Sequence, residues 1–244
     1  FNKTTGALTK LEYRGMQMLA AAPVINTWRA PTDNDGGIKF KWMDAGYHMF
    51  ISHVYSVKII KETDTEIVLQ TEGSLGKFST WPAIRLLNNW TVYGNGEIKV
   101  EVNVQLRQDE KKELPFLPRF GMQFTMPKGN EIVEYFGYGP HESYIDKHRS
   151  TRKSRYLTTV DAMFENYLMP QENGSHYNTD WAVISNKQGM GLLFAGCESF
   201  SFNAAHYTPM DLTKARHPHE LKKREETIVN IDYGMSGVGS NSCG

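Results

Sequence analysis

The segment WRAPTDND at residues 28–35 gathers the side chains of this sequence that are best suited to binding or chemistry. It combines an indole, a guanidinium, a proline-fixed turn and three amide or carboxylate groups, and two glycines follow it. Such a polar group is costly to bury unless its members are hydrogen-bonded. In one interpretation the acids tie off a long loop and the arginine pairs with one of them. In the other, the loop borders a binding pocket and the glycines let it move. The residues concerned are Trp28, Arg29, Asp33, Asn34, Asp35, Gly36 and Gly37.

Histidines near glutamates form a second set of candidates. Such pairs can act as acid and base in proton transfer, but the spacing supports no particular pair, and we favour hydrogen-bonded structural histidines. The sequence His217-Pro218-His219 has no third ligand nearby, so we expect no zinc site there. The candidate histidines are His141, His176 and His206, and the candidate glutamates are Glu142, Glu172 and Glu198.

The composition argues against several classes of function. The 244 residues carry 27 basic and 27 acidic side chains, a balance that provides no field for attracting nucleic acid or an anionic membrane. No apolar run approaches the roughly 20 residues of a membrane helix. The two cysteines, Cys197 and Cys243, suggest neither a disulfide framework nor a metal set. We expect both to be reduced, with Cys197 in the core.

Alternation with a period of two predicts antiparallel strands. It is clearest at residues 97–106, where valines and other apolar residues alternate with polar ones after a Gly-Asn-Gly turn. This pattern is typical of a hairpin strand that is covered on one face. Further strands are expected at residues 54–61, 66–71, 90–93, 120–126, 132–136, 182–185, 191–195, 199–203 and 227–233.

Helical signals are few. Thr208, Pro209 and Asp211 form a capping pattern for a short helix that ends near residue 215, and a turn of helix is expected at residues 40–46. The hydrophilic run at residues 107–113 predicts a solvated loop. Many strands joined by turns predict an all-β fold, a single large antiparallel two-sheet β-sandwich domain over residues 1–244 with one or two short helices.

Seven motifs occur in order along nearly the whole chain. They are WRAPTDND, LPRFGM (117–122), YGPHESYID (138–146), MPQENG (169–174), FSFN (200–203), NIDYGM (230–235) and GVGSNS (237–242). One such motif alone would be weak evidence, but the ordered set is specific. It resembles the C-terminal β-sandwich, or small-chain domain, of bacterial β-galactosidases in glycoside hydrolase family two. The resemblance implies the large sandwich of the galactose-mutarotase-like superfamily.

The resemblance implies a role within a larger enzyme. In such enzymes the two carboxyl groups that cleave the glycosidic bond lie in a separate (β/α)8 barrel, which these residues do not include. We therefore expect no catalytic residue here. The parent would hydrolyse terminal β-D-galactosides such as lactose with retention, and this part would support the barrel and contact the other domains. An oligomeric parent is implied. Any Mg or Na would serve the parent, and we expect no cofactor or metal in this part.

The resemblance also implies that residues 28–37 and 237–244 border the galactoside pocket. Some family members stack a tryptophan on the sugar near the end of the second of these loops. Gly244 stands at about that place, so packing against a neighbouring domain is the favoured interpretation of this loop. Its candidate rim residues are Ser242 and Gly244.

Residues 138–146, with the basic side chains of Lys147, His148, Arg149 and Arg152, could form a carbohydrate cleft or a subunit contact. We favour a tight turn that ties strands together through Glu142, Tyr144 and Asp146.

The two ends of the chain lead us to expect a piece of a longer protein, because it begins without methionine and stops within a glycine-rich loop. A missing signal peptide then constrains localisation little; a cytoplasmic parent is the expectation and a periplasmic one the alternative. Two other functions stay open from the sequence: a stand-alone mutarotase-like aldose epimerase and a carbohydrate-binding module.

Overall fold

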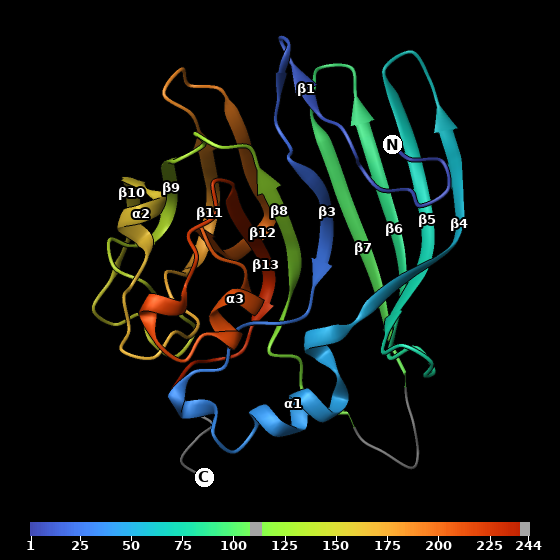
Figure 1. The fold of residues 1–244 in the computed structure, drawn as a ribbon. Coiled ribbons are helices and arrows are strands. Elements are labelled where there is room, and N and C mark those ends of the chain that lie inside the picture. The colour runs from blue at the N-terminus through green and yellow to red at the C-terminus, as the bar shows by residue number, and fades with distance from the viewer. Residues whose placement is uncertain (108–113, 240–244) are drawn as a thin grey trace. The chain divides into compact units, whose positions relative to one another are not determined.

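A computed structural model describes residues 1–107 and 114–239 (Figure 1). Strands hold 48% of the residues and helices 11%, in antiparallel sheets of seven and four strands. This confirms the predicted all-β, antiparallel class with few short helices. The chain divides into two compact units, and the single sandwich domain over residues 1–244 stays a prediction. Most of the predicted loop at residues 107–113 lies outside the described residues, as do Ser242, Cys243 and Gly244.

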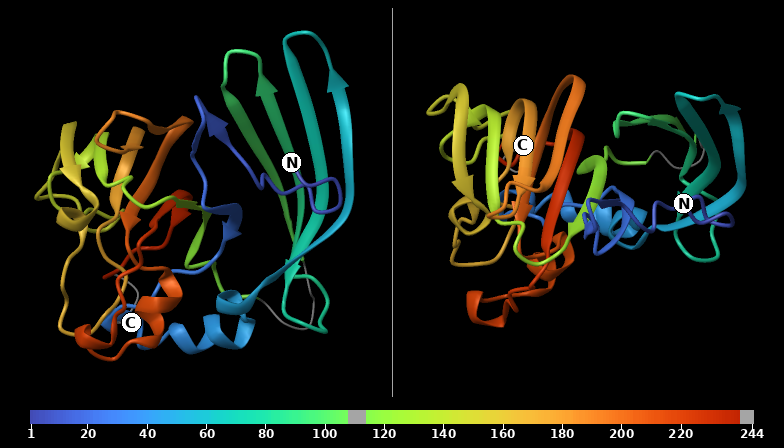
Figure 2. Two further views of the ribbon diagram at one scale, coloured as in Figure 1. Left: turned by 45° about the horizontal axis from the view of Figure 1, so that its top comes forward. Right: turned by 90° about the horizontal axis from the view of Figure 1, so that it is seen from above.

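The first unit, here called the four-stranded unit, comprises Phe1–Thr9 and Asp44–Pro115. After the short helix η2 (Tyr47–Met49), each of its strands runs antiparallel to the next. Figure 2 shows the four strands side by side in one curved sheet. They are β4 (Ile51–Glu62), β5 (Glu66–Gly76), β6 (Ile84–Tyr93) and β7 (Ile98–Leu106).

The register of this sheet accounts for the alternating sequence. Trp90 of β6 lies opposite Leu69 of β5 and Val100 of β7, so the alternate apolar residues share one face. The ring of Phe1 packs edge-on against Trp90, with 5.6 Å between the ring centroids. Gly96 has a φ of 94° in the turn between β6 and β7, which glycine adopts without strain. The predicted hairpin is confirmed.

The second unit, here called the seven-stranded unit, comprises Lys10–Met43 and Phe116–Gly244. The strands of its sheet lie in the order β10, β9, β11, β12, β13, β8, β3. A separate hairpin is formed by β1 (Glu12–Tyr13) and β2 (Met16–Gln17). The strands of the main sheet are β3 (Ala21–Asn26), β8 (Arg119–Met126), β9 (Ile132–Gly139), β10 (Arg152–Thr159), β11 (His176–Ser185), β12 (Gly191–Ala205) and β13 (Thr227–Met235).

Short helices complete the fold. Helix α1 (Lys39–Ala45) includes the point where the chain passes between the units, and it confirms the turn expected at residues 40–46. Helix α3 (Pro209–Lys214) begins as predicted, because Thr208 and Asp211 cap each other's backbone N–H groups. The others are η1 (Asp33–Asp35), α2 (Val160–Met163) and η3 (Pro218–Glu220). No helix in the described part of the chain has the length and apolar character needed to cross a bilayer.

The apolar core of the seven-stranded unit lies on one face of its sheet. Val133 and Tyr135 of β9 lie beside Ala182 and Ile184 of β11 in register. Helix α2 contributes Val160 and Met163 to the same cluster, and β12, β13 and β8 extend it. Burial of these side chains provides the main driving force for forming this sheet.

Three details differ from the sequence predictions. The sequence does not predict β3 or β10, and β10 lacks apolar alternation because it is an exposed edge strand. Residues 191–195 and 199–203 belong to one strand, β12, whose pairing with β11 is interrupted by register shifts. Cys197 is exposed, so its predicted place in the core is wrong.

Candidate functional site

Arg29 is the centre of the first loop (residues 28–37). Its fully buried guanidinium binds both oxygens of Asp35, with Nη1 to Oδ2 at 2.6 Å and Nη2 to Oδ1 at 3.0 Å. The same group lies over the ring of Trp42 and donates to the carbonyl oxygen of Gly237 at 2.9 Å. A bidentate, desolvated pair of this kind fixes geometry strongly. The structure therefore has the arginine paired with an acid, as the first interpretation of WRAPTDND held.

The turn of helix η1 determines which acid of the first loop is buried. Asp35 Oδ2 accepts from the backbone N–H of Thr32 at 2.7 Å and from its hydroxyl at 3.0 Å. Asp33 is exposed, and its backbone N–H donates to the side chain of Gln171, a residue of MPQENG, at 3.1 Å. The turn thus places the carboxylate of Asp35 inside and leaves the carboxylate of Asp33 and the amide of Asn34 exposed.

The second loop (residues 237–239) is held against the first. The carbonyl oxygen of Val238 accepts from Asn34 Nδ2 at 3.1 Å and from Thr32 Oγ1 at 3.2 Å. Its N–H donates to Asp146 Oδ1 at 3.1 Å. The structure therefore brings together the described parts of both loops that the sequence predicted to border a pocket.

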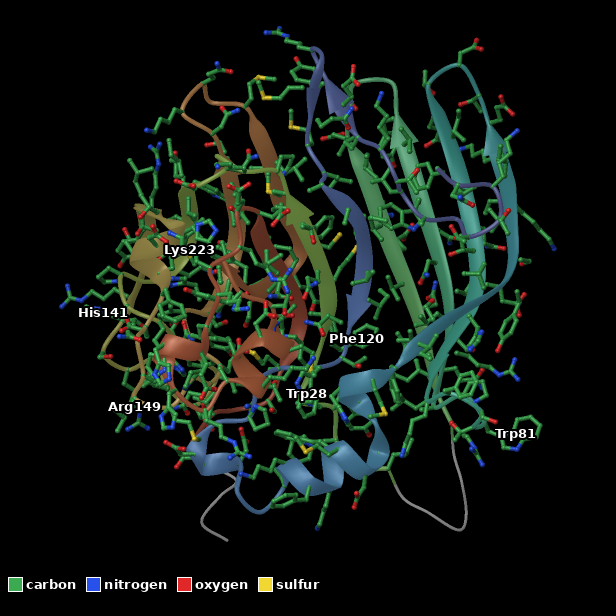
Figure 3. All side chains as sticks on the ribbon, viewed as in Figure 1. Trp28, Trp81, Phe120, His141, Arg149 and Lys223 are labelled. Atoms are coloured by element: carbon green, nitrogen blue, oxygen red, sulfur yellow. The ribbon has the colours of Figure 1, made fainter. Side chains whose placement is uncertain are left out.

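Trp28 is a packing residue in this structure. Its Nε1 donates to Thr213 Oγ1 of α3 at 2.9 Å, and its ring meets that of Trp42 edge-on; Figure 3 shows Trp28 beside α3. Gly36 and Gly37 are both exposed, and Gly36 has right-handed helical angles that any residue adopts. Of the predicted rim residues that the structure describes, four lie at the surface, namely Asp33, Asn34, Gly36 and Gly37, whereas Trp28, Arg29 and Asp35 are buried.

A second buried arginine, Arg119 of LPRFGM, lies between two carboxylates. Its Nη2 is 2.6 Å from Glu172 Oε1 and its Nε is 3.1 Å from Asp232 Oδ1. Its Nη1 donates to the carbonyl oxygen of Trp28 at 3.4 Å, at the base of the first loop. Gly121 makes room for this arrangement, because a Cβ there would lie 2.5 Å from Asp232 Oδ1.

The charges of this buried cluster do not balance when both acids are ionised. Two carboxylates then face one guanidinium, and Asp232 Oδ2 and Glu172 Oε2 have no hydrogen-bond partner among the described residues. Burial raises the pKa of Asp232 to about 7, opposed by the charge of Arg119 and reinforced by that of Glu172. Asp232 therefore takes up a proton near neutral pH, which restores the balance.

A row of asparagines extends this cluster across the sheet. Asn26 of β3 donates to Asn230 of β13 at 3.0 Å, and Asn230 donates to Asn203 of β12 at 2.9 Å. Asn203 reaches Glu172 at 3.4 Å. Because each amide both donates and accepts, the row satisfies polar groups that would otherwise be costly to bury.

Glu142 of YGPHESYID is the centre of a third polar cluster. It accepts from Lys147 Nζ at 2.6 Å, from Tyr144 at 3.1 Å, from the N–H of Gly174 at 2.9 Å and from Tyr167. Burial alone would raise the pKa of Glu142, but the bonds from Lys147, Tyr167 and Gly174 outweigh it and lower that pKa. The carboxylate is thus committed to holding structure, as the favoured tight-turn interpretation of this motif expected.

The candidate histidines occupy structural positions. Burial lowers the pKa of His176 to about 4, and its Nδ1 is 2.9 Å from the carbonyl oxygen of Tyr138. His206 Nδ1 is 2.9 Å from the carbonyl oxygen of Glu226, whereas His141 is exposed. Within residues 1–107 and 114–239, no hydrogen bond joins one of these histidines to a candidate glutamate. The favoured interpretation of structural histidines agrees with these contacts.

Metal ligation finds no support in the described part of the chain. No three His, Cys, Asp or Glu side chains there are grouped so that they could hold a metal ion. His217 and His219 stack their rings with centroids 5.5 Å apart. We place no metal ligand among these residues.

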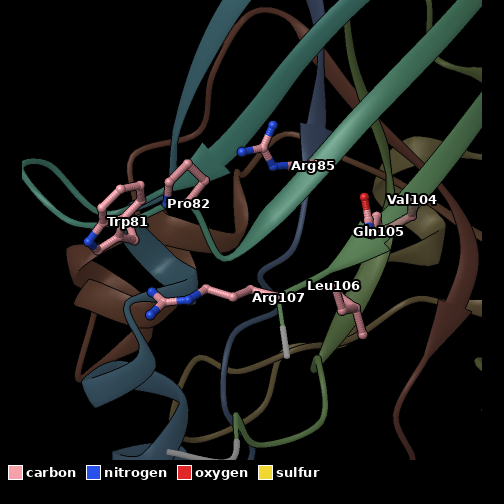
Figure 4. A pocket seen from close by; sticks show the side chains of 7 residues that line it. All are labelled: Trp81, Pro82, Arg85, Val104, Gln105, Leu106 and Arg107. Carbon is pink, nitrogen blue, oxygen red and sulfur yellow. The ribbon is translucent and has the colours of Figure 1, made fainter. Parts of the chain in front are cut away.

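The four-stranded unit contains a hollow of about 760 Å³ beside the ends of β6 and β7 (Figure 4). Trp81, one of its lining residues, is 76% exposed. Its described lining residues include no carboxylate, so they offer no acid pair for glycoside cleavage. The lining residues are Trp81, Pro82, Arg85, Val104, Gln105, Leu106 and Arg107.

The whole sequence matches the family model described as β-galactosidase small chain, over residues 1–244. The chain belongs to this family. The β-galactosidase of Actinobacillus pleuropneumoniae is 35% identical over 243 residues, covering 100% of this chain and 23% of that protein. That of Staphylococcus xylosus is 36% identical over 244 residues, covering 100% and 24%. That of Priestia megaterium is 30% identical over 249 residues, covering 99% and 23%. This small-chain region therefore spans about a quarter of the length of these relatives.

The sequence indicated the small-chain motifs, but it did not indicate the buried polar contacts that most of them form. Arg119 and Asp232 were not singled out, and Glu172 was considered only for proton transfer. The available signal was a charged residue inside a strand pattern that is otherwise apolar, which is unusual unless the charge is paired.

Proposed function

We propose that this chain is a non-catalytic part of a β-galactosidase, which supports the catalytic barrel and lends loops to the rim of its pocket. The substrate class would be terminal β-D-galactosides such as lactose, cleaved with retention by carboxylates outside this chain. The partners would be the barrel and the other domains of the parent enzyme. Mg or Na, where the enzyme uses them, would bind in those other parts.

The observation that carries the proposal is the joining of the first and second loops through Val238. Both loops were expected at the pocket rim, and hydrogen bonds from Thr32 and Asn34 to one carbonyl oxygen make them a single piece. A rim built in this way presents a fixed surface to a substrate, and pre-organisation of that kind lowers the entropy lost on binding.

The use of the motif carboxylates also supports a non-catalytic role. Asp35, Glu142 and Glu172 are buried and bonded to Arg29, Lys147 and Arg119 respectively. A retaining glycosidase needs two carboxyl groups about 5 Å apart on either side of the bond that breaks. Buried acids that are each bonded to a basic side chain of this chain do not meet that need.

Complementation tests the proposal. The chain would be mixed with the remaining three quarters of the Staphylococcus xylosus β-galactosidase, and hydrolysis of a chromogenic galactoside would be followed. We expect neither piece to be active alone and the mixture to be active. Cleavage by the chain alone would contradict the non-catalytic role.

Two further assays distinguish the alternatives. Faster decay of the optical rotation of fresh α-galactose would favour an aldose epimerase. Saturable binding of galactose without turnover, measured by calorimetry, would favour a carbohydrate-binding module.

A further inference from the structure

Both carboxylate oxygens of Asp146 accept hydrogen bonds from the second loop. Oδ1 accepts from the N–H of Val238 at 3.1 Å, and Oδ2 accepts from the N–H of Gly239 at 2.9 Å. Two consecutive backbone amides on one carboxylate fix the direction of the chain at that point, because charged acceptors form the stronger hydrogen bonds.

The opposite side of the same peptide is held by the first loop. The carbonyl oxygen of Val238 accepts from Asn34 and Thr32. Rotation of the second loop would therefore break contacts on both sides. Gly237 fits this arrangement, since a Cβ there would lie only 2.4 Å from Asp146 Oδ2.

Asp146 is itself presented by a rigid turn. Tyr144 and Lys147 exchange backbone hydrogen bonds of 2.9 and 3.0 Å, so that Asp146 stands at the tip of a two-residue turn. Both flanking side chains bind the buried carboxylate of Glu142. The turn is thus anchored from below, while Asp146 is exposed and reaches across to the second loop.

We infer that Asp146 is a positioning residue, which sets the course of the second loop and thereby the shape of the pocket rim. The inference rests on the proposed function, since it assigns a role to a loop that we place at that rim. If the second loop is no longer held in place, substrate binding should change more than the cleavage of the glycosidic bond. The expected signature is a change in KM rather than in kcat.

The loop contact is tested first in the isolated chain, by amide hydrogen exchange at Val238 and Gly239. Replacing Asp146 by Ala removes both acceptors. Because hydrogen bonds to a charged acceptor are strong, their loss should make amide exchange at these two residues about tenfold faster or more. Asp146→Asn keeps one acceptor oxygen and should give a smaller effect. Asp64→Asn, in the exposed turn between β4 and β5, removes the same charge elsewhere and should leave both rates unchanged. Unchanged exchange in Asp146→Ala would overturn the inference.

The role at the rim is tested in the complemented enzyme. With Asp146→Ala we expect KM for a chromogenic galactoside to rise about three- to tenfold, with kcat within about twofold of the unsubstituted chain. Asp64→Asn should change neither constant. Faster exchange with an unchanged KM would overturn the positioning role and leave a purely structural contact. If the unsubstituted chain fails to complement, the proposed function fails and so does the role at the rim, whereas the exchange rates still decide whether Asp146 holds the loop.

Discussion

Replacing Asp232 by Asn should remove a pH dependence of stability that originates in the Arg119 cluster. In the folded chain the pKa of Asp232 is raised from 3.8 to about 7, so the folded state keeps a proton that the unfolded state has released. Stability from this group is fully present below pH 4 and is lost as the pH rises toward 7. The groups facing Asp232 are Arg119 and Glu172, with Tyr144 close to both of these.

The size of the effect follows from the shift. About three pKa units at 1.36 kcal/mol each give a loss of at most about 4 kcal/mol between pH 4 and pH 8. Asparagine is neutral at every pH, like the protonated acid, so the variant does not suffer this loss. We expect the difference in unfolding free energy, unsubstituted chain minus Asp232→Asn, to fall by about 2–3 kcal/mol from pH 5 to pH 8, because about two of the three pKa units lie in that range.

Urea unfolding at several pH values, followed by tryptophan fluorescence, measures this difference. Trp28 and Trp42 lie in the same unit as Asp232 and report its unfolding. His176 titrates in the opposite sense, because its pKa is lowered in the folded state, but it is present in both proteins and cancels. Asp180→Asn, an exposed acid of the same unit, is the control. A difference that stays constant or grows with pH would refute the account of the cluster.

Three further outcomes are expected. Gly121→Ala should destabilise the chain by about 2 kcal/mol, because the new methyl group meets backbone 2.3 Å away; Gly234→Ala, with open space around it, should cost far less, and thermal unfolding compares the two. Arg29→Lys should cost about 2 kcal/mol, since lysine cannot form the paired bonds of a buried guanidinium, whereas Arg152→Lys at an exposed edge should be nearly neutral in the same denaturant assay. The imidazole of His176 should stay neutral down to about pH 4, which an NMR titration of the histidine ring signals measures; protonation near pH 6.5 would contradict its burial.

The sequence predicted best those strands in which apolar and polar residues alternate within the strand itself. Residues 97–106 alternate strictly and form β7 (Ile98–Leu106). Strand β10 (Arg152–Thr159) reads RKSRYLTT, which has no apolar face, and it is a strand because it pairs with β9 at the sheet edge. Such a strand is determined by its neighbour rather than by its own pattern.

The candidate site also contains contacts that the local sequence pattern does not determine. One of the two interpretations of the sequence paired Arg29 with an acid of its own loop, and the turn of η1 selects Asp35. It could not predict the partners of Arg119, because Glu172 and Asp232 come from distant segments that only the folded sheet brings together. Pairing across such distances depends on strand order, which local propensity does not encode.

The place of β13 in the sheet has a consequence for biosynthesis. β13 (Thr227–Met235) lies between β12 and β8, so until it leaves the ribosome the ladder of the seven-stranded unit exists as two unconnected halves. Each strand of the four-stranded unit pairs with the strand that follows it in the sequence, so these pairs can form as the chain emerges from the ribosome. The nascent protein therefore exposes two open strand edges until β13 has emerged, and such edges invite aggregation. A chaperone that shields β8 and β12 would be most useful during that interval.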